Sequence, residues 1–86
     1  MIYIEGLKDY AKIHLNTSEK SILTLITLKA MEDKLSKGRF MRIHNSFIVS
    51  LEKISSVTKN TVFLNKTMLP LSDKFKQFSK FINRWQ

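Results

Sequence analysis

The sequence predicts a small α+β domain in which strands predominate. Apolar and polar residues alternate over residues 10–15, as in a strand with one exposed face, and the spacing becomes helical over residues 28–35. Short β-prone runs follow from residue 40, and no strand–helix–strand crossover pattern appears. A chain of 86 residues can bury one modest core. We therefore expect one domain over residues 1–86.

The first part of the chain predicts a short strand followed by a hairpin. Residues 2–4 are β-prone, and Glu5-Gly6 is a loop signal that closes this run. Residues 21–26 are rich in β-branched side chains, and the turn-forming residues 16–19 separate them from residues 10–15. Two strands joined by a turn are expected there.

A short amphipathic helix is expected after this hairpin. Leu28, Met31 and Leu35 recur at the spacing of one helix face. Thr27 can cap the start of the helix, and Gly38 is expected to end it in a left-handed turn. The polar face carries charges of both signs, which weakens its approach to phosphates.

The second half predicts several short strands. Residues 40–43 and 47–49 are β-like, and the polar, turn-tolerant residues 44–46 separate them. The remaining expected elements are a helical turn at residues 51–54 and strands at residues 55–59, 62–64 and 68–71. Pro70 confines the last of these to a sheet edge or a strand end.

A final helix is expected at the end of the chain. Ser72 or Asp73 can cap its start, and its other face is basic. Its apolar stripe consists of Phe75, Phe78, Ile82 and Trp85.

The charge balance is the strongest feature of the composition. Fifteen Lys and Arg residues against seven Asp and Glu give a formal net charge of +8. Such a surface attracts nucleic acid, an anionic membrane or an acidic protein, although it can also serve solubility alone. Uncharged runs such as residues 21–28 are too short to cross a bilayer, and no leader opens the chain. We expect a cytoplasmic protein with no membrane partner.

Enzymatic chemistry is disfavoured. The absence of cysteine excludes disulfides, thiol catalysis and cysteine-rich zinc sites, and two glycines cannot build a phosphate-binding loop. The acids are not paired at a spacing that serves acid–base catalysis. His14 and His44 lie thirty residues apart without a third ligand type around them. We expect no enzyme, metal or cofactor.

Three polar or basic groups occur where a β scaffold can hold them outward. Arg can bond guanine or phosphate, Asn can pair with adenine, and His and Ser can donate to phosphate oxygens. No segment resembles a recognition helix, so base reading is expected from loops. The candidate DNA-binding residues are Lys8, Tyr10 and Lys12, then Arg42, His44, Asn45 and Ser46, and finally Ser72 and Lys74.

The order of these motifs resembles the LytTR family of bacterial DNA-binding domains. The specific part is residues 40–49, Phe-Met-Arg-Ile-His-Asn-Ser-Phe-Ile-Val, which has the form of the family signature. Further matches are Tyr-Ile-Glu-Gly at residues 3–6, Asp-Tyr-Ala-Lys-Ile at residues 9–13 and Leu-Pro-Leu-Ser at residues 69–72. The resemblance extends from residue 2 to about residue 82.

The resemblance implies an elongated antiparallel β-sheet sandwich with two short helices, not a helix-turn-helix. It implies the output domain of a two-component response regulator, behind a receiver domain, that binds double-stranded DNA and regulates transcription. Loop side chains would enter successive major grooves of a direct-repeat site. We expect Asn45 to read bases, while Arg42, His44 and Ser46 divide between DNA backbone contacts and internal hydrogen bonds.

Two departures from the family pattern matter. Asp73 stands where relatives often carry a basic residue, so the basic role moves to Lys74. The chain also begins where a complete member would already have supplied one or two strands. We therefore expect residues 10–15 or a neighbouring strand to form an open edge, which could pair in a homodimer or strand exchange.

Two other functions remain open at this point. One is a protein-interaction or dimerisation module whose basic surface serves solubility or an acidic partner. The other is a small RNA-binding β domain, which would stack bases on exposed aromatic side chains, and only Tyr10 is a candidate for that role.

Overall fold

The computed structural model describes residues 2–15, 20–35, 38–64 and 67–75. The elements, in chain order, are β1 (Tyr3–Leu7), β2 (Tyr10–His14), β3 (Ser21–Thr24), α1 (Leu28–Lys34), β4 (Phe40–His44), β5 (Phe47–Ser50), the 3₁₀ turn η1 (Leu51–Lys53), β6 (Ser56–Val57), β7 (Thr61–Leu64), β8 (Thr67–Pro70) and the 3₁₀ turn η2 (Asp73–Phe75).

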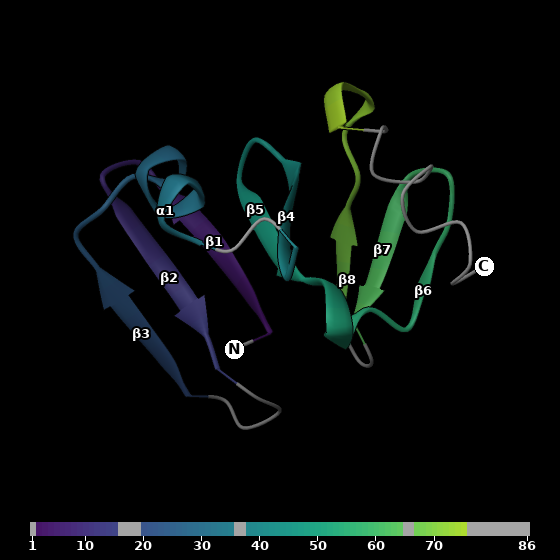
Figure 1. Ribbon diagram of the computed structural model, residues 1–86, viewed down its shortest axis with the longest axis horizontal. Helices are drawn as coiled ribbons and strands as arrows, with labels where there is room; N and C mark the ends of the chain where they lie inside the picture. Colours follow the sequence, from purple (N-terminus) through teal and green to yellow (C-terminus); the bar gives the residue numbers. More distant parts are fainter. Residues whose placement is uncertain (1, 16–19, 36–37, 65–66, 76–86) are drawn as a thin grey trace.

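The strands form two antiparallel sheets, which lie side by side in Figure 1. One sheet has five strands in the order β3-β2-β1-β5-β4, and the other has three in the order β6-β7-β8. The β1–β5 pair joins distant parts of the sequence, whereas the other five pairs join consecutive strands. The predicted strand-dominated α+β class is confirmed, and the described residues contain one α-helix and no helix-turn-helix.

Two hydrophobic clusters hold the layers together, and β5 contributes to both. Ile48 and Val49 are consecutive, so their side chains point to opposite faces of the sheet. The helix-side cluster lies beneath α1 and consists of Ile4, Ala11, Leu28 and Ile48. The inter-sheet cluster consists of Ile43, Val49, Leu51, Ile54, Val57, Val62, Leu64, Leu69 and Leu71.

Helix α1 starts as the sequence predicts but ends differently. The Thr27 hydroxyl accepts a hydrogen bond from the Ala30 backbone N–H at 3.2 Å, which confirms the cap. The expected left-handed end at Gly38 is wrong, because the helix stops at Lys34 and Gly38 has no positive φ. Leu35 turns into an extended conformation and packs against the helix-side cluster.

The loop expected at Glu5-Gly6 is also wrong, because β1 continues to Leu7 and the chain turns at Lys8 and Asp9. Gly6 marks a close approach instead of a turn. A Cβ atom added there would lie 3.2 Å from the Leu28 Cβ, so the missing side chain lets α1 approach the sheet.

The edges of the sheets only partly match expectation. Strand β2 is interior, paired on both sides, while its neighbour β3 forms an edge of the five-stranded sheet. Pro70 ends β8, an edge strand, as predicted. The expected helical turn after β5 is confirmed as η1. Beyond η2, the stripe residues Phe78, Ile82 and Trp85 lie outside the described residues.

Candidate nucleic-acid interface

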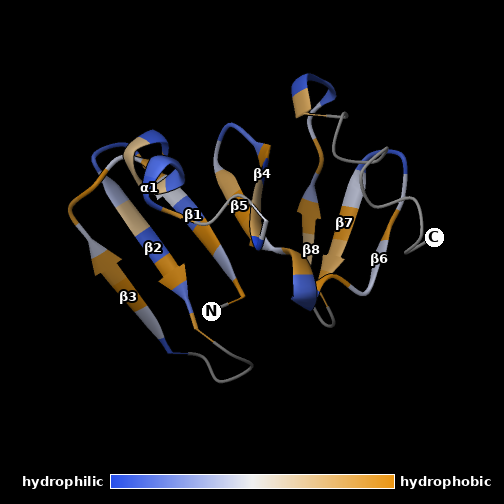
Figure 2. Cartoon of the chain, viewed as in Figure 1, coloured by the Kyte–Doolittle hydropathy of each residue, from blue (hydrophilic) through white to orange (hydrophobic). Residues whose placement is uncertain are grey.

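Each of the three predicted polar groups has its turn at one end of the molecule, which we name the loop end. It comprises the β1–β2 turn, the β4–β5 turn and η2, all at the top of Figure 1. The Gly6 N–H donates to the Ser46 carbonyl at 2.8 Å, and the Ser72 N–H donates to the Ile43 carbonyl at 2.9 Å. The first bond joins β1 to the β4–β5 turn, and the second joins β4 to the segment that leads to η2. Figure 2 shows that the turns at this end are hydrophilic.

A fourth turn at the loop end was not among the predicted groups. The β6–β7 turn carries Lys59 and Asn60, and both are exposed. The Asn60 carbonyl accepts from the Leu71 N–H at 2.8 Å, which places the turn beside the segment that leads to η2. Its sequence signal was a Lys-Asn pair between two strand patterns, and only the register of β7 with β8 brings it to this end.

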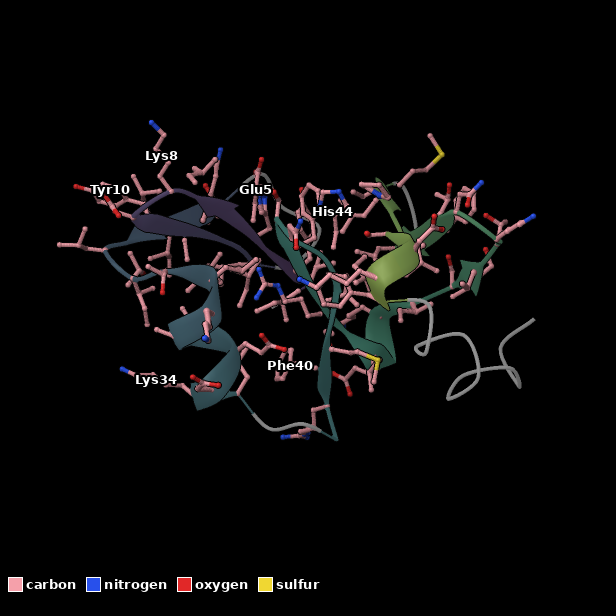
Figure 3. All side chains as sticks on the ribbon, turned by 90° about the horizontal axis from the view of Figure 1, so that it is seen from above. Glu5, Lys8, Tyr10, Lys34, Phe40 and His44 are labelled. Carbon is pink, nitrogen blue, oxygen red and sulfur yellow. The ribbon has the colours of Figure 1, made fainter. Side chains whose placement is uncertain are left out.

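The β1–β2 turn presents its side chains outward. Lys8 and Asp9 are exposed, and Lys8 adopts a φ of 58°, as the first position of a type II′ hairpin turn requires. Tyr10 is 44% exposed. Figure 3, which looks down on the loop end, shows Lys8 and Tyr10 on the side of the sheet away from Lys34 of α1. Lys12 is half-buried and lies further along β2, opposite Glu5.

The β4–β5 turn has a different geometry. Asn45 and Ser46 form a two-residue loop, and neither has a positive φ. The pairing register shifts between Arg42 and His44, which leaves Ile43 as an extra residue on β4. A two-residue loop of this kind does not match the twist of its strands, so other contacts must hold it.

Side chains supply these contacts. Arg42 donates from Nε to the His44 carbonyl at 3.2 Å and from Nη2 to the Asn45 carbonyl at 2.6 Å. Its Nη1 lies 3.2 Å from Oε1 of Glu32, on α1. The His44 Nδ1 accepts from the Ser46 N–H at 3.0 Å. The expectation of internal hydrogen bonds is therefore confirmed for Arg42 and His44.

The Asn45 side chain, by contrast, faces solvent. The residue is exposed, and its side-chain amide makes no hydrogen bond within the described part of the chain. Two donors and one acceptor with two lone pairs remain available at the apex of a braced turn. This is the group at the loop end that is best suited to bond a base edge.

The η2 segment closes the loop end beside β4. Lys74 is exposed, and its Nζ lies 5.7 Å from the centre of the Phe75 ring. The Arg42 guanidinium lies at the same distance from that ring. Ser72 is half-buried, and its carbonyl accepts from the Phe75 N–H at 2.9 Å.

An aromatic row crosses the face of the five-stranded sheet that is turned away from α1. Tyr3 stacks on His14 with ring centres 4.1 Å apart, and Phe47 lies between Tyr3 and His44. Burial raises the pKa of the Tyr3 hydroxyl above its usual value, and the Glu5 carboxylate adds to this rise. The Glu5 carboxylate also lies 3.4 Å from His14 Nε2. These contacts make His14 a packing residue of the sheet.

The described residues offer little to other kinds of site. They contain no group of three or more His, Cys, Asp or Glu side chains that could hold a metal ion. In the same part of the chain, no helix has the length and apolar character needed to cross a membrane.

Comparisons with known proteins identify the family of the chain. A family model described as the LytTr DNA-binding domain matches residues 1–83. The chain is 29% identical over 89 residues to the sensory transduction protein LytT of Bacillus anthracis, covering 95% of this chain and 35% of that protein. The same figures hold for LytT of Bacillus cereus. The chain thus spans about a third of the length of these curated relatives.

A solved structure is similar as well. It is described as the LytTr DNA-binding domain of a putative methyl-accepting/DNA response regulator from Bacillus cereus. The TM-score is 0.76 at 25% identity, and the match covers 94% of this chain and 79% of that one. With a family model that matches nearly its whole length, the chain belongs to the LytTr DNA-binding domain family.

Proposed function

We propose that this chain binds double-stranded DNA in a sequence-specific manner, as the output domain of a response regulator that controls transcription. Membership of a family of DNA-binding domains supports the proposal, and so does the similarity to sensory transduction proteins. The observation that carries it is the exposed Asn45 amide on a turn that Arg42 and His44 brace. Because the backbone of the turn is already held, binding to a base edge would need to order the Asn45 side chain but not the turn that carries it.

The loop end would divide the work of recognition between two kinds of residue. Asn45 would enter a major groove and pair with the N6 and N7 atoms of an adenine. The basic and hydroxyl groups around it would contact phosphates and set the register. These are Lys8, Tyr10 and Lys12 on the β1–β2 side, Ser46 in the central turn, and Lys59, Ser72 and Lys74 on the other side.

The same proposal extends to the partners. The curated relatives are sensory transduction proteins about three times as long as the matched segment, and by this similarity we propose a receiver domain as a partner of the chain in a longer protein. Loops at both sides of Asn45 suit a direct-repeat site in which successive major grooves face the same side of the duplex. The homodimer stays a prediction.

A second candidate function rests on β3. This edge strand is exposed and apolar, with Leu23 59% exposed and Leu25, just beyond it, 71% exposed. Such an edge can pair with another strand, which favours an interaction or dimerisation module. Sedimentation across a concentration series, without DNA, would reveal self-association and so separate the two functions.

Binding-site selection followed by titration tests the DNA function. The selected direct-repeat duplex should bind at least about a thousandfold more tightly than random duplex, with affinity falling as salt rises. If selected and random duplexes bind equally, the sequence-specific function is wrong.

Replacement of Asn45 by Ala tests the residue that carries the proposal. The variant should lose about 1–3 kcal/mol on the selected duplex and relax the preference at one base pair. Asn60→Ala is the matched control, because Asn60 is exposed in the neighbouring β6–β7 turn. Equal weakening of the Asn45 variant on every duplex would make Asn45 a backbone contact instead.

A further inference from the structure

Arg42 is a cation at the loop end whose guanidinium is already occupied. Its three nitrogens contact the carbonyls of His44 and Asn45 and the carboxylate of Glu32, and its side chain is 18% exposed. The Phe75 ring lies 5.7 Å from its central carbon. An arginine used in this way has few donors left for a phosphate.

The turn that Arg42 contacts needs such support. Asn45 and Ser46 lack the positive φ of the hairpin turns that match strand twist, and the extra residue on β4 bends the strand just before them. The planar guanidinium can hold two consecutive carbonyls in fixed directions. The direction of the intervening Asn45 side chain follows from those carbonyls.

Glu32 connects this turn to the rest of the fold. It lies on α1, whose Leu28 is buried against Gly6 of β1. The Glu32 carboxylate contacts the guanidinium nitrogen that does not bond the turn. Within the described part of the chain, the side-chain hydrogen bonds therefore connect Glu32 to the turn through Arg42.

We infer that Glu32 and Arg42 form a positioning pair for DNA recognition. Glu32 orients the guanidinium, Arg42 holds the two carbonyls of the turn, and the turn aims Asn45, while Arg42 itself makes no contact with DNA. The inference rests on the proposed DNA function. The opposite role for Arg42 is a phosphate contact for which Glu32 competes.

The variant Glu32→Gln separates these roles, with Asp33→Asn as its control. Both changes remove one negative charge from α1, and Asp33 is the exposed neighbour. A positioning pair predicts that Glu32→Gln binds the selected duplex about two- to fivefold more weakly than Asp33→Asn does. The affinity for random duplex and the dependence of binding on salt should be the same for both variants.

Two results would overturn the inference. Tighter binding of Glu32→Gln than of Asp33→Asn on both duplexes, with a salt slope steeper by about 0.9, would make Arg42 a phosphate contact. If the two variants bind each duplex with equal affinity, Glu32 and Arg42 do not position the β4–β5 turn.

The variant Arg42→Lys keeps the charge but loses the planar fork. Its affinity for the selected duplex should fall at least as far as that of Glu32→Gln, without a change on random duplex. Because the two residues act through one contact, Glu32→Gln should add nothing further in the Arg42→Lys background. Additive losses would contradict the inference. Thermal unfolding by circular dichroism verifies that each variant is folded.

A measurement without DNA keeps this test independent of the proposed function. In amide NMR spectra, Glu32→Gln should shift the signals of Asn45 and Ser46 more than Asp33→Asn does. Shifts no larger than those of the control would overturn the positioning pair even if DNA binding is intact. Failure of the unmodified chain to bind any selected duplex would instead remove the proposed function, whatever the spectra show.

Discussion

The β1–β2 turn and the β4–β5 turn are hairpin loops of equal length at the same end of one sheet, but they are held in different ways. Lys8 takes the positive φ that its turn requires, and both turn residues point into solvent. In the β4–β5 turn the backbone stays at negative φ, and Arg42 and His44 supply the bonds. A basic side chain near a turn can therefore be a surface charge or an internal brace.

The residues that support the two turns also differ in how deeply they are buried. Ile43, the extra residue of β4, is fully buried and its carbonyl accepts from Ser72. Leu7, the last residue before the β1–β2 turn, is 43% exposed. One turn is anchored in the inter-sheet cluster, and the other projects from the end of a strand.

Replacement of Ile43 by Ala should have the largest effect on stability. We expect a loss of about 2–5 kcal/mol in the free energy of unfolding, because the change leaves a cavity in the inter-sheet cluster. Leu7→Ala, the matched change beside the other turn, should cost less than about 1 kcal/mol. Urea denaturation measures both values. Equal losses would remove the distinction between an anchored and a projecting turn.

Replacement of the first residue of each turn by glycine should act in opposite directions. Lys8→Gly should raise the free energy of unfolding by about 1 kcal/mol, because glycine adopts positive φ without steric cost. Asn45→Gly should lower it by several tenths of a kcal/mol, since negative φ gains nothing from glycine and the unfolded chain becomes freer. Thermal denaturation monitored by circular dichroism compares them. Stabilisation by both changes would contradict the difference in backbone geometry.

The smallest effect is expected from lysines that serve only as surface charges. Lys59→Ala should weaken binding equally on all duplexes and reduce the salt slope by about 0.9. Lys53→Ala removes the same charge from η1, at the opposite end of the molecule, and should leave the slope unchanged. Fluorescence anisotropy at several salt concentrations tests the pair. If Lys53→Ala reduced the salt slope and Lys59→Ala did not, the DNA would have to bind another face of the protein.

The periodic parts of the fold were predictable from the sequence. Alternation over β2, helical spacing over α1 and the Thr27 cap depend on neighbouring residues alone, and the structure confirms them. The two errors at Gly6 and Gly38 have the opposite origin. Gly6 lies against Leu28, which is distant in sequence. The helix ends at Lys34, before Gly38 is reached, and the extended Leu35 packs against the helix-side cluster.

The candidate site was predictable in composition but not in arrangement. The signature segment predicted Arg42, His44 and Asn45 as candidates together. Which of these side chains point inward depends on the register shift and on Glu32, which the structure reveals. Lys59 could not be assigned to the loop end from its own surroundings. Its position depends on how β7 and β8 align, which no local pattern encodes.

The pairing of β1 with β5 has a consequence for how the domain assembles. Among the described strands it is the one pairing that must close a long stretch of chain, from Glu5 to Phe47, and such closures are slow because chain entropy is lost before the contacts form. The hairpins on either side can form early and locally. Until Tyr3 pairs with Val49, however, the β1–β2 turn and the β4–β5 turn belong to hairpins that are not yet paired with each other. We therefore expect the surface proposed to read DNA to form late in folding, when β1 pairs with β5.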